Sequence, residues 1–411
     1  MLRTAFLLFL LLFNFQKPQC CNPSFAGFRD NPFKPGDEVL LSSGIDEIKN
    51  KRVALLTNQT GILSNGTHII DAMVEKGINV VKIFSPEHGI RGDENYSDED
   101  EKTGIPVVSL YGDKNKPSNS DLSDVDILVY DIQDAGARFY TYTSTLNYAI
   151  QAASENNVKM IVCDRPIIIN PAYVDGFMLE GGYKSFVGSI PTPVCYGMTC
   201  GELAGFLSSS NYPGGSPVKV IKMENYTHST DYNSLNLKWV KPSPSMYTSA
   251  TAVCYPAECF LEGTNVSEGR GTEKPFEYFG APWLNSQAAA DELNSYNLPG
   301  VKFEQITFTP SEKISSYPPK FFNTECNGVY LNVTDKNKFE AVKTGVAILA
   351  ALHKLAPEFK FNKDNFIDKL AGTDKLRKMI NAGNDYNSII SLWEDDLNSF
   401  KQQREKYLLY K

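Results

Sequence analysis

Short apolar runs rich in β-branched residues alternate with amphipathic stretches along the first half of this chain. The apolar runs predict strands at residues 51–57, 80–84, 106–110, 126–130 and 159–163. The amphipathic stretches predict helices at residues 69–76, 143–156 and 201–208. Strands separated by helices form βαβ units, and their right-handed crossovers bring the strand ends to one edge of the sheet. The chain is therefore predicted to be an α/β protein with a mainly parallel sheet.

Two clusters of turn-forming residues interrupt this pattern, YPGGSP at 212–217 and PSP at 242–244. Beyond them, the predicted elements are a strand at residues 328–333 and helices at residues 339–353 and 388–407. These elements predict a second, smaller α/β domain. We place the first domain at residues 37–225 and the second at residues 226–411.

Residues 1–20 have the pattern of a secretory signal peptide. Met1 to Arg3 supply a short positive end, and residues 5–15 form an apolar run that is interrupted only by Asn14 and is short for a membrane span. No other segment is apolar enough to cross a bilayer, and the net charge of −8 argues against a nucleic-acid or anionic-membrane partner. The mature protein is expected to be secreted, or periplasmic in a Gram-negative host. The oligomeric state stays open.

The chain contains eight cysteines. Because closely spaced cysteines in a secreted protein are candidate disulfides, the pairs Cys195/Cys200 and Cys254/Cys259 are expected to close short loops, although spacing alone leaves the connectivity open. No C-x-x-C motif occurs and the four histidines are scattered, so no metal site is predicted. No G-x-G-x-x-G follows the first strand, so no cofactor is predicted either.

Three predicted strands run from apolar residues into clusters of charged and aromatic side chains. In chain order these are Glu87, His88 and Arg91; Asp134, Arg138, Tyr140 and Tyr142; and Asp164 and Arg165. Open parallel sheets bind their ligands at the carboxyl ends of the strands, so we expect the site there. For Asp164 and Arg165 we favour a structural ion pair or helix cap. For Glu87 and Asp134 we favour a functional role, because neither is flanked by an obvious partner on its own face.

A second polar cluster is the segment 262–272, with the sequence EGTNVSEGRGT. Its glycines let the backbone approach a ligand closely, and Asn265, Glu268 and Arg270 can form hydrogen bonds to that ligand. The segment lacks the Gly-Lys-Ser/Thr of a P-loop, so phosphate binding has little support, and a sugar or a peptide fits equally well. The alternative is an irregular loop with a purely structural role.

Three motifs resemble those of the exo-β-N-acetylmuramidase family of NamZ type, long catalogued as a domain of unknown function. They are FSPEHGIRG at 84–92, DIQDAGARFYTY at 131–142 and EGTNVSEGRGT at 262–272. The resemblance extends from about Asp37 to the C-terminus. It implies a Rossmann-like first domain, a smaller second domain and an active-site cleft between them. It also implies hydrolysis of terminal, non-reducing N-acetylmuramic acid from peptidoglycan fragments, so the expected partner is a muropeptide or another amino-sugar glycan.

In the resembled family, the glutamate that matches Glu87 is the leading catalytic candidate. We expect Glu87 to act as the general acid and His88 to orient it. The second carboxylate, or the group that orients the substrate acetamide, is expected to be Asp134 or Glu268. The residues expected to bind substrate include arginines for its lactyl carboxylate and aromatic rings for its sugar: Arg91, Arg138, Arg270, Tyr140, Tyr142 and Asn265.

The chain departs from the family pattern at four positions. Ile167 and Ser245 stand where the family has asparagines, and Cys195 and Tyr196 stand where it has Arg-His. If the missing groups contact the sugar, the specificity of this protein has shifted or its activity is lost. The alternatives are therefore a secreted glycan-binding protein without catalysis and a hexosaminidase that acts on sugars lacking the lactyl group.

Overall fold

The computed structural model describes residues 32–92, 97–211, 218–313 and 318–411. The predicted signal peptide at 1–20 lies outside the described residues, as do Cys20 and Cys21. Residues Phe33–Lys411 form one compact unit. Within the described ranges, no helix is both long enough and apolar enough to span a membrane.

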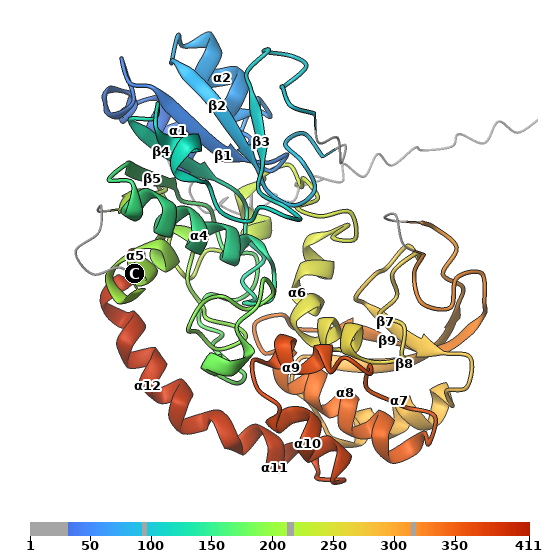
Figure 1. Cartoon of the computed structure of the whole chain (residues 1–411). Helices are drawn as coiled ribbons and strands as arrows, with labels where there is room; N and C mark the ends of the chain where they lie inside the picture. The colour runs from blue at the N-terminus through green and yellow to red at the C-terminus, as the bar shows by residue number, and fades with distance from the viewer. Residues whose placement is uncertain (1–31, 93–96, 212–217, 314–317) are drawn as a thin grey trace, which may run out of the picture. The chain divides into compact units, whose positions relative to one another are not determined.

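Six parallel strands form the main sheet, in the order β3-β2-β1-β4-β5-β6 (Figure 1). They are β1 (Val53–Thr57), β2 (Val80–Ser85), β3 (Val107–Ser109), β4 (Ile127–Asp131), β5 (Lys159–Cys163) and β6 (Val218–Ile221). Every residue of β1 and β4 is buried, which explains why these strands read as continuous apolar runs. The predicted parallel sheet is confirmed. The strand order places the topological switch point between β1 and β4.

Helices cover both faces of this sheet. They are α1 (Gly36–Leu41), α2 (Ile69–Glu75), α3 (Asn119–Leu122), α4 (Tyr142–Glu155) and α5 (Cys200–Asn211). Successive side chains of a strand point to opposite faces, so Leu55 packs in one core with α1 and α2. Its neighbour Leu56 packs in the other core with α4 and α5. Loops follow the carboxyl ends of β1, β2 and β4.

A smaller antiparallel sheet follows, in the order β7-β9-β8. Its strands are β7 (Tyr278–Ala281), β8 (Val301–Phe308) and β9 (Cys326–Val333). The helices of this half are α6 (Ser249–Glu258), α7 (Ser286–Ser295), α8 (Ala341–Leu355), α9 (Phe366–Ala371), α10 (Lys375–Asn381), α11 (Tyr386–Ile390) and α12 (Glu394–Arg404). Short 3-10 helices occur at Ile45–Glu47, Gly181–Tyr183, Tyr232–Leu235, Cys259–Gly263, Ser391–Trp393 and Glu405–Tyr407.

The predicted strand 328–333 lies within β9, and the predicted helix 339–353 corresponds to α8. The single helix predicted at 388–407 is instead divided between α11 and α12. Apolar residues of both sheets belong to one continuous core. The domain boundary placed after residue 225, and the cleft, therefore stay predictions.

The two charged residues after β5 serve the fold. Asp164 accepts hydrogen bonds from a backbone N–H at the start of α5 (2.7 Å) and from the hydroxyl of Tyr410 (2.6 Å). Arg165 forms ion pairs with Asp131 (2.6 Å) and Asp37 (2.9 Å). Asp164 therefore caps the start of α5, which is one of the two structural roles predicted for this pair. Arg165 forms its ion pairs with Asp131 and Asp37 and not with Asp164.

The expected disulfide loops are wrong. All six cysteines among the described residues are free and buried. Cys254 lies within α6 and Cys259 directly follows that helix, so a spacing of five residues turns their side chains to different sides. Cys200 begins α5 and directs its thiol toward Asp164 (3.3 Å), while the backbone of Cys195 is bridged to Asp175.

Candidate active site

The loops at the switch point bring Glu87 and Asp134 to the same edge of the sheet. In the strand register, Leu56 of β1 lies beside Phe84 of β2, and Thr57 lies beside Asp131 of β4. The residues that follow these strands therefore emerge next to one another. Open α/β sheets bind their ligands at this position, outside the carboxyl ends of the strands at the switch point.

Glu87 is half-buried in the turn after β2. The hydroxyl of Thr141 donates to its Oε2 at 2.7 Å, and the hydroxyl of Tyr142 lies 3.4 Å from its backbone carbonyl oxygen. The next residue, His88, has a left-handed backbone (φ 73°), which is uncommon for a residue with a side chain. The turn thus fixes one oxygen of the Glu87 carboxyl against the loop that follows β4.

Tyr140 lies near both acids, and Tyr142 packs against it. Their rings meet edge to face with centroids 5.0 Å apart. The Tyr140 hydroxyl is buried and has no hydrogen-bond partner of good geometry among the described residues, although Ser243 lies close to it. Burial raises the pKa of Tyr140, and the negative charges of Asp134 and Glu87 raise it further. The phenol is therefore close enough to both carboxyl groups to sense their charges.

Asp134 is a buried acid with one oxygen unused. The hydroxyl of Tyr196 donates to its Oδ2, and the backbone N–H of Gly136 donates to the same oxygen at 3.2 Å. Its Oδ1 has no partner among the described residues. Burial raises the pKa of Asp134 to about 6, although these hydrogen bonds oppose the shift. Such a carboxyl group can change its charge near neutral pH.

Four buried polar atoms without partners gather at this edge. They are Asn58 Nδ2, Gln59 Oε1, Asp134 Oδ1 and the Tyr140 hydroxyl, considered within the part of the chain that the structure describes; Asn58 lies close to Tyr142, and Tyr140 close to Ser243, without good hydrogen-bond geometry. Buried polar groups are almost always hydrogen-bonded, so a group of unpaired donors and acceptors calls for an explanation. A bound ligand that supplies hydroxyl and amide groups would pair with them.

A cavity of about 430 Å³ opens beside the turn that carries Glu87, although neither Glu87 nor Asp134 is among its lining residues. It is lined by Gln59, by residues of the segments 88–92 and 240–247, and by Glu312 and Lys313. The amide of Gln59 donates to the carbonyl oxygens of residues 241 and 242, at 2.9 and 3.1 Å. The segment 240–247 is therefore tied directly to the end of β1.

The three arginines predicted to bind substrate are all engaged within the protein. Arg91 lines the cavity and forms ion pairs with Asp100 (2.6 Å) and Asp71 (2.9 Å). Arg138 is fully buried and donates to the carbonyl oxygens of Phe177, Thr192, Leu370 and Ala371. Burial lowers the pKa of Arg138 to about 9. The structure does not bring Arg138 to the group around Glu87.

The predicted residues of the segment 262–272 form a separate group. Arg270 pairs with Glu262 (2.6 Å) and with Glu268 (3.4 Å), and Glu268 also pairs with Lys320 (3.0 Å). Burial alone would raise the pKa of Glu268, but the positive charges of Lys320 and Arg270 outweigh burial and hold this pKa below its usual value. Asn265 binds the backbone of residues 358 and 360, each at 2.8 Å, so its amide joins two loops.

Two bridges join this group to the strand ends. Arg270 donates to the hydroxyl of Ser245 at 3.0 Å, and residue 245 follows the segment that Gln59 holds. Aromatic rings also connect the groups, because Tyr255 packs edge to face against Tyr140 (5.6 Å) and Phe276 (4.9 Å). The structure thus places the two predicted clusters in contact through intermediaries.

Two of the four residues that depart from the family pattern contact predicted site residues. Tyr196 contacts Asp134, and Ser245 contacts Arg270. Ile167 is buried, and its backbone N–H donates to a tyrosine hydroxyl at 3.3 Å. Cys195 is buried and free.

Sequence reasoning missed several residues of the site. Asn58 and Gln59 directly follow a predicted strand, and that position was a usable signal. Lys241 and Ser243 lie in a proline-rich segment that suggested only a turn. Lys320 carries no signal, because its contact with Glu268 joins residues 52 positions apart.

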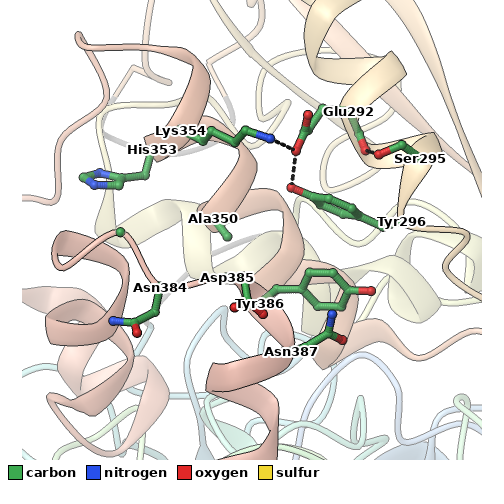
Figure 2. Close-up of a pocket in the computed structure, with 11 residues that line it drawn as sticks. Glu292, Ser295, Tyr296, Ala350, His353, Lys354, Asn384, Asp385, Tyr386 and Asn387 are labelled. Atoms are coloured by element: carbon green, nitrogen blue, oxygen red, sulfur yellow. Dashed lines mark hydrogen bonds and ion pairs between the residues drawn. The ribbon is translucent and has the colours of Figure 1, made fainter.

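A larger cavity of about 810 Å³ lies among α7, α8 and the residues before α11 (Figure 2). None of the predicted site residues lines it. Within it Glu292 accepts from Tyr296 (2.7 Å) and pairs with Lys354 (2.6 Å). Across the described parts of the chain, no cluster of three or more His, Cys, Asp or Glu side chains has the arrangement of a metal site.

Comparison with known proteins gives a consistent result. The family models described as exo-β-N-acetylmuramidase NamZ, N-terminal and C-terminal, match residues 53–250 and 253–410. The chain is 43% identical over 382 residues to the peptidoglycan β-N-acetylmuramidase NamZ of Bacillus subtilis (strain 168), covering 91% of each protein. Two crystal structures of DUF1343 family proteins from Bacteroides fragilis NCTC 9343 are also similar. One has a TM-score of 0.86 at 34% identity, covering 92% of this chain and 99% of its own. The other has a TM-score of 0.77 at 37% identity, covering 93% and 99%.

Proposed function

Because this chain belongs to the NamZ family of exo-β-N-acetylmuramidases, we propose that it releases terminal, non-reducing N-acetylmuramic acid from peptidoglycan fragments. The observation that carries the proposal is the position of Glu87 at the switch point, near four buried polar atoms that have no hydrogen-bond partner of good geometry among the described residues. The family models extend over nearly all of the described chain, so the glycosidase assignment does not rest on one motif.

Glu87 is assigned as the general acid that protonates the leaving glycosidic oxygen. The hydroxyl of Thr141 donates to Oε2 of Glu87, and Oε1 is assigned to the substrate. His88 lines the adjacent cavity, from which the substrate would approach. In this arrangement His88 positions the turn and borders the substrate.

Asp134 is assigned as the second carboxyl group in preference to Glu268. Its Oδ1 is free to accept a proton from water or from the substrate acetamide N–H. Both oxygens of Glu268 are already occupied by Lys320 and Arg270. Glu268 therefore holds the surrounding loop, and a pKa near 6 suits Asp134 to proton transfer close to neutral pH.

The test is release of 4-nitrophenol from its β-N-acetylmuraminide by the purified protein, with the β-N-acetylglucosaminide assayed alongside. Turnover of the muraminide alone supports the proposal. Turnover of the glucosaminide alone would show that the sugar specificity has shifted. A folded protein that turns over neither sugar but binds muropeptides would instead be a glycan-binding protein.

We further propose that the protein is secreted after cleavage of residues 1–20. The basis is the apolar run at 5–15, and a peptidoglycan substrate lies outside the cytoplasm. N-terminal sequencing of the protein recovered from the culture medium or periplasm tests this. A protein that keeps Met1 and stays with the cells would contradict it.

A further inference from the structure

N-acetylmuramic acid differs from N-acetylglucosamine by a lactyl ether that carries a carboxylate, and this inference rests on the proposed function. A protein that selects the muramide needs a cation to bind that carboxylate. Arg91 and Arg270 are neutralised by acidic side chains, and Arg138 is buried among backbone carbonyls. None of the three is free to recruit a substrate anion.

Lys241 meets the requirement at the cavity that His88, the residue after Glu87, also lines. It lines that cavity together with His88, and its backbone carbonyl accepts from the side chain of Gln59 at 2.9 Å. Its ammonium lies over the ring of Tyr247, 3.9 Å from the centroid. Within the described ranges, no carboxylate lies at ion-pair distance from it. The backbone of Lys241 is thus fixed at the site while its charge stays available.

The charges around the cavity favour an anion. Lys241 and Lys313 contribute positive charge, and Arg91 contributes a cation that its acidic partners neutralise. Glu312 is the carboxylate of the lining, and it accepts from the hydroxyl of Tyr247 at 3.3 Å. The lining itself therefore carries two lysines against one glutamate, a balance that favours an anionic ligand.

We propose that this cavity is the subsite for the carboxylate of the substrate's lactyl ether, with Lys241 as the side chain that binds it. The ammonium rests over the Tyr247 ring, so it is partly ordered before the ligand arrives. Lys241 is accordingly a specificity residue that distinguishes muramides from glucosaminides. Glu87 performs the same chemistry on either sugar.

The test compares Lys241→Met with the wild type on both 4-nitrophenyl glycosides. We expect kcat/KM for the muraminide to fall about tenfold or more, mainly through KM, while any turnover of the glucosaminide stays unchanged. Lys241→Arg keeps the charge and should retain most of the muraminide activity. Lys238→Met is the matched control, because Lys238 is exposed and lies outside the cavity lining.

A second measurement separates this proposal from the proposed function. NMR titration measures the binding of N-acetylmuramic acid and of N-acetylglucosamine to the Glu87→Gln protein. This measurement needs no turnover. The subsite is supported if the Glu87→Gln/Lys241→Met protein loses binding of N-acetylmuramic acid but keeps binding of N-acetylglucosamine, relative to Glu87→Gln. This holds even if hydrolysis is never seen. Equal binding of muramic acid with and without Lys241 overturns it, whatever the activity.

Discussion

The loop after β4 and the segment 262–272 each bury one acidic side chain, and the two environments have opposite effects. Among the described residues no cation lies beside Asp134, and burial raises its pKa to about 6. Glu268 lies between Lys320 and Arg270, which hold its pKa below the usual value despite similar burial. Burial alone therefore does not make a carboxyl group reactive. The missing counter-charge does, and it marks the strand-end loop as the chemical half of the site.

If the reaction belongs to the strand ends, Glu87→Gln gives the largest effect. We expect kcat to fall about 10²–10⁴-fold, because the amide cannot protonate the leaving oxygen. The melting temperature should change little, since the Thr141 hydroxyl can still donate to the amide oxygen. Steady-state kinetics and thermal melting measure both quantities.

The control for this variant is Glu99→Gln, because Glu99 is exposed in the same loop. A folded Glu87→Gln protein with wild-type turnover would remove the strand-end assignment and make the segment 262–272 the better candidate.

Glu268→Gln tests the other half of the comparison. Removing this charge takes away an acid that Lys320 and Arg270 share, but Arg270 keeps Glu262 and both cations are partly exposed, so we expect a loss of about 1–3 kcal/mol in the free energy of unfolding at pH 7. The stabilisation by Glu268 is present above pH 4.5 and is lost as the pH falls through its lowered folded pKa. Urea denaturation at pH 7 and at pH 4 measures the effect.

Glu325→Gln provides an exposed control for these measurements. If the Glu268→Gln protein is as stable as the wild type but loses turnover, Glu268 has a catalytic role. That result would contradict the assignment of the chemistry to Asp134.

Asp134→Asn should have the opposite effect on stability. The folded pKa near 6 lies above the unfolded value of about 3.9, so the free energy of unfolding falls as the pH rises between these values. The uncharged amide avoids this loss, and we expect a gain of about 1–3 kcal/mol at pH 7. Turnover should fall in the same variant. A stability loss equal to that of Glu268→Gln would show that the two environments are alike.

Tyr196→Phe is expected to have the smallest effect, and it tests the environment of Asp134. The Tyr196 hydroxyl donates to Asp134 and lowers its pKa, so its removal should raise that pKa. We expect the acidic limb of the kcat/KM profile, which falls as the pH drops through about 6, to move up by about one pH unit or less. An unchanged limb would mean that another group controls it.

The parallel sheet was accessible from the sequence because β1 and β4 are buried on both faces and read as apolar runs. Strand β8 was missed because exposed residues interrupt its apolar ones. Glu87 and Asp134 could be selected by their position after a strand. The fate of Arg138 could not be foreseen, because an isolated arginine looks the same in sequence whether it meets a substrate or backbone carbonyls.

The guanidinium of Arg138 has a consequence for the order of folding. Its hydrogen bonds span 39 and 54 residues to Phe177 and Thr192, and 232 and 233 residues to Leu370 and Ala371. A charged group cannot leave water before its acceptors are present. The loop after β4 therefore reaches its final state only when the segment near residue 370 has docked, which makes late, non-local closure a slow step in assembling the site.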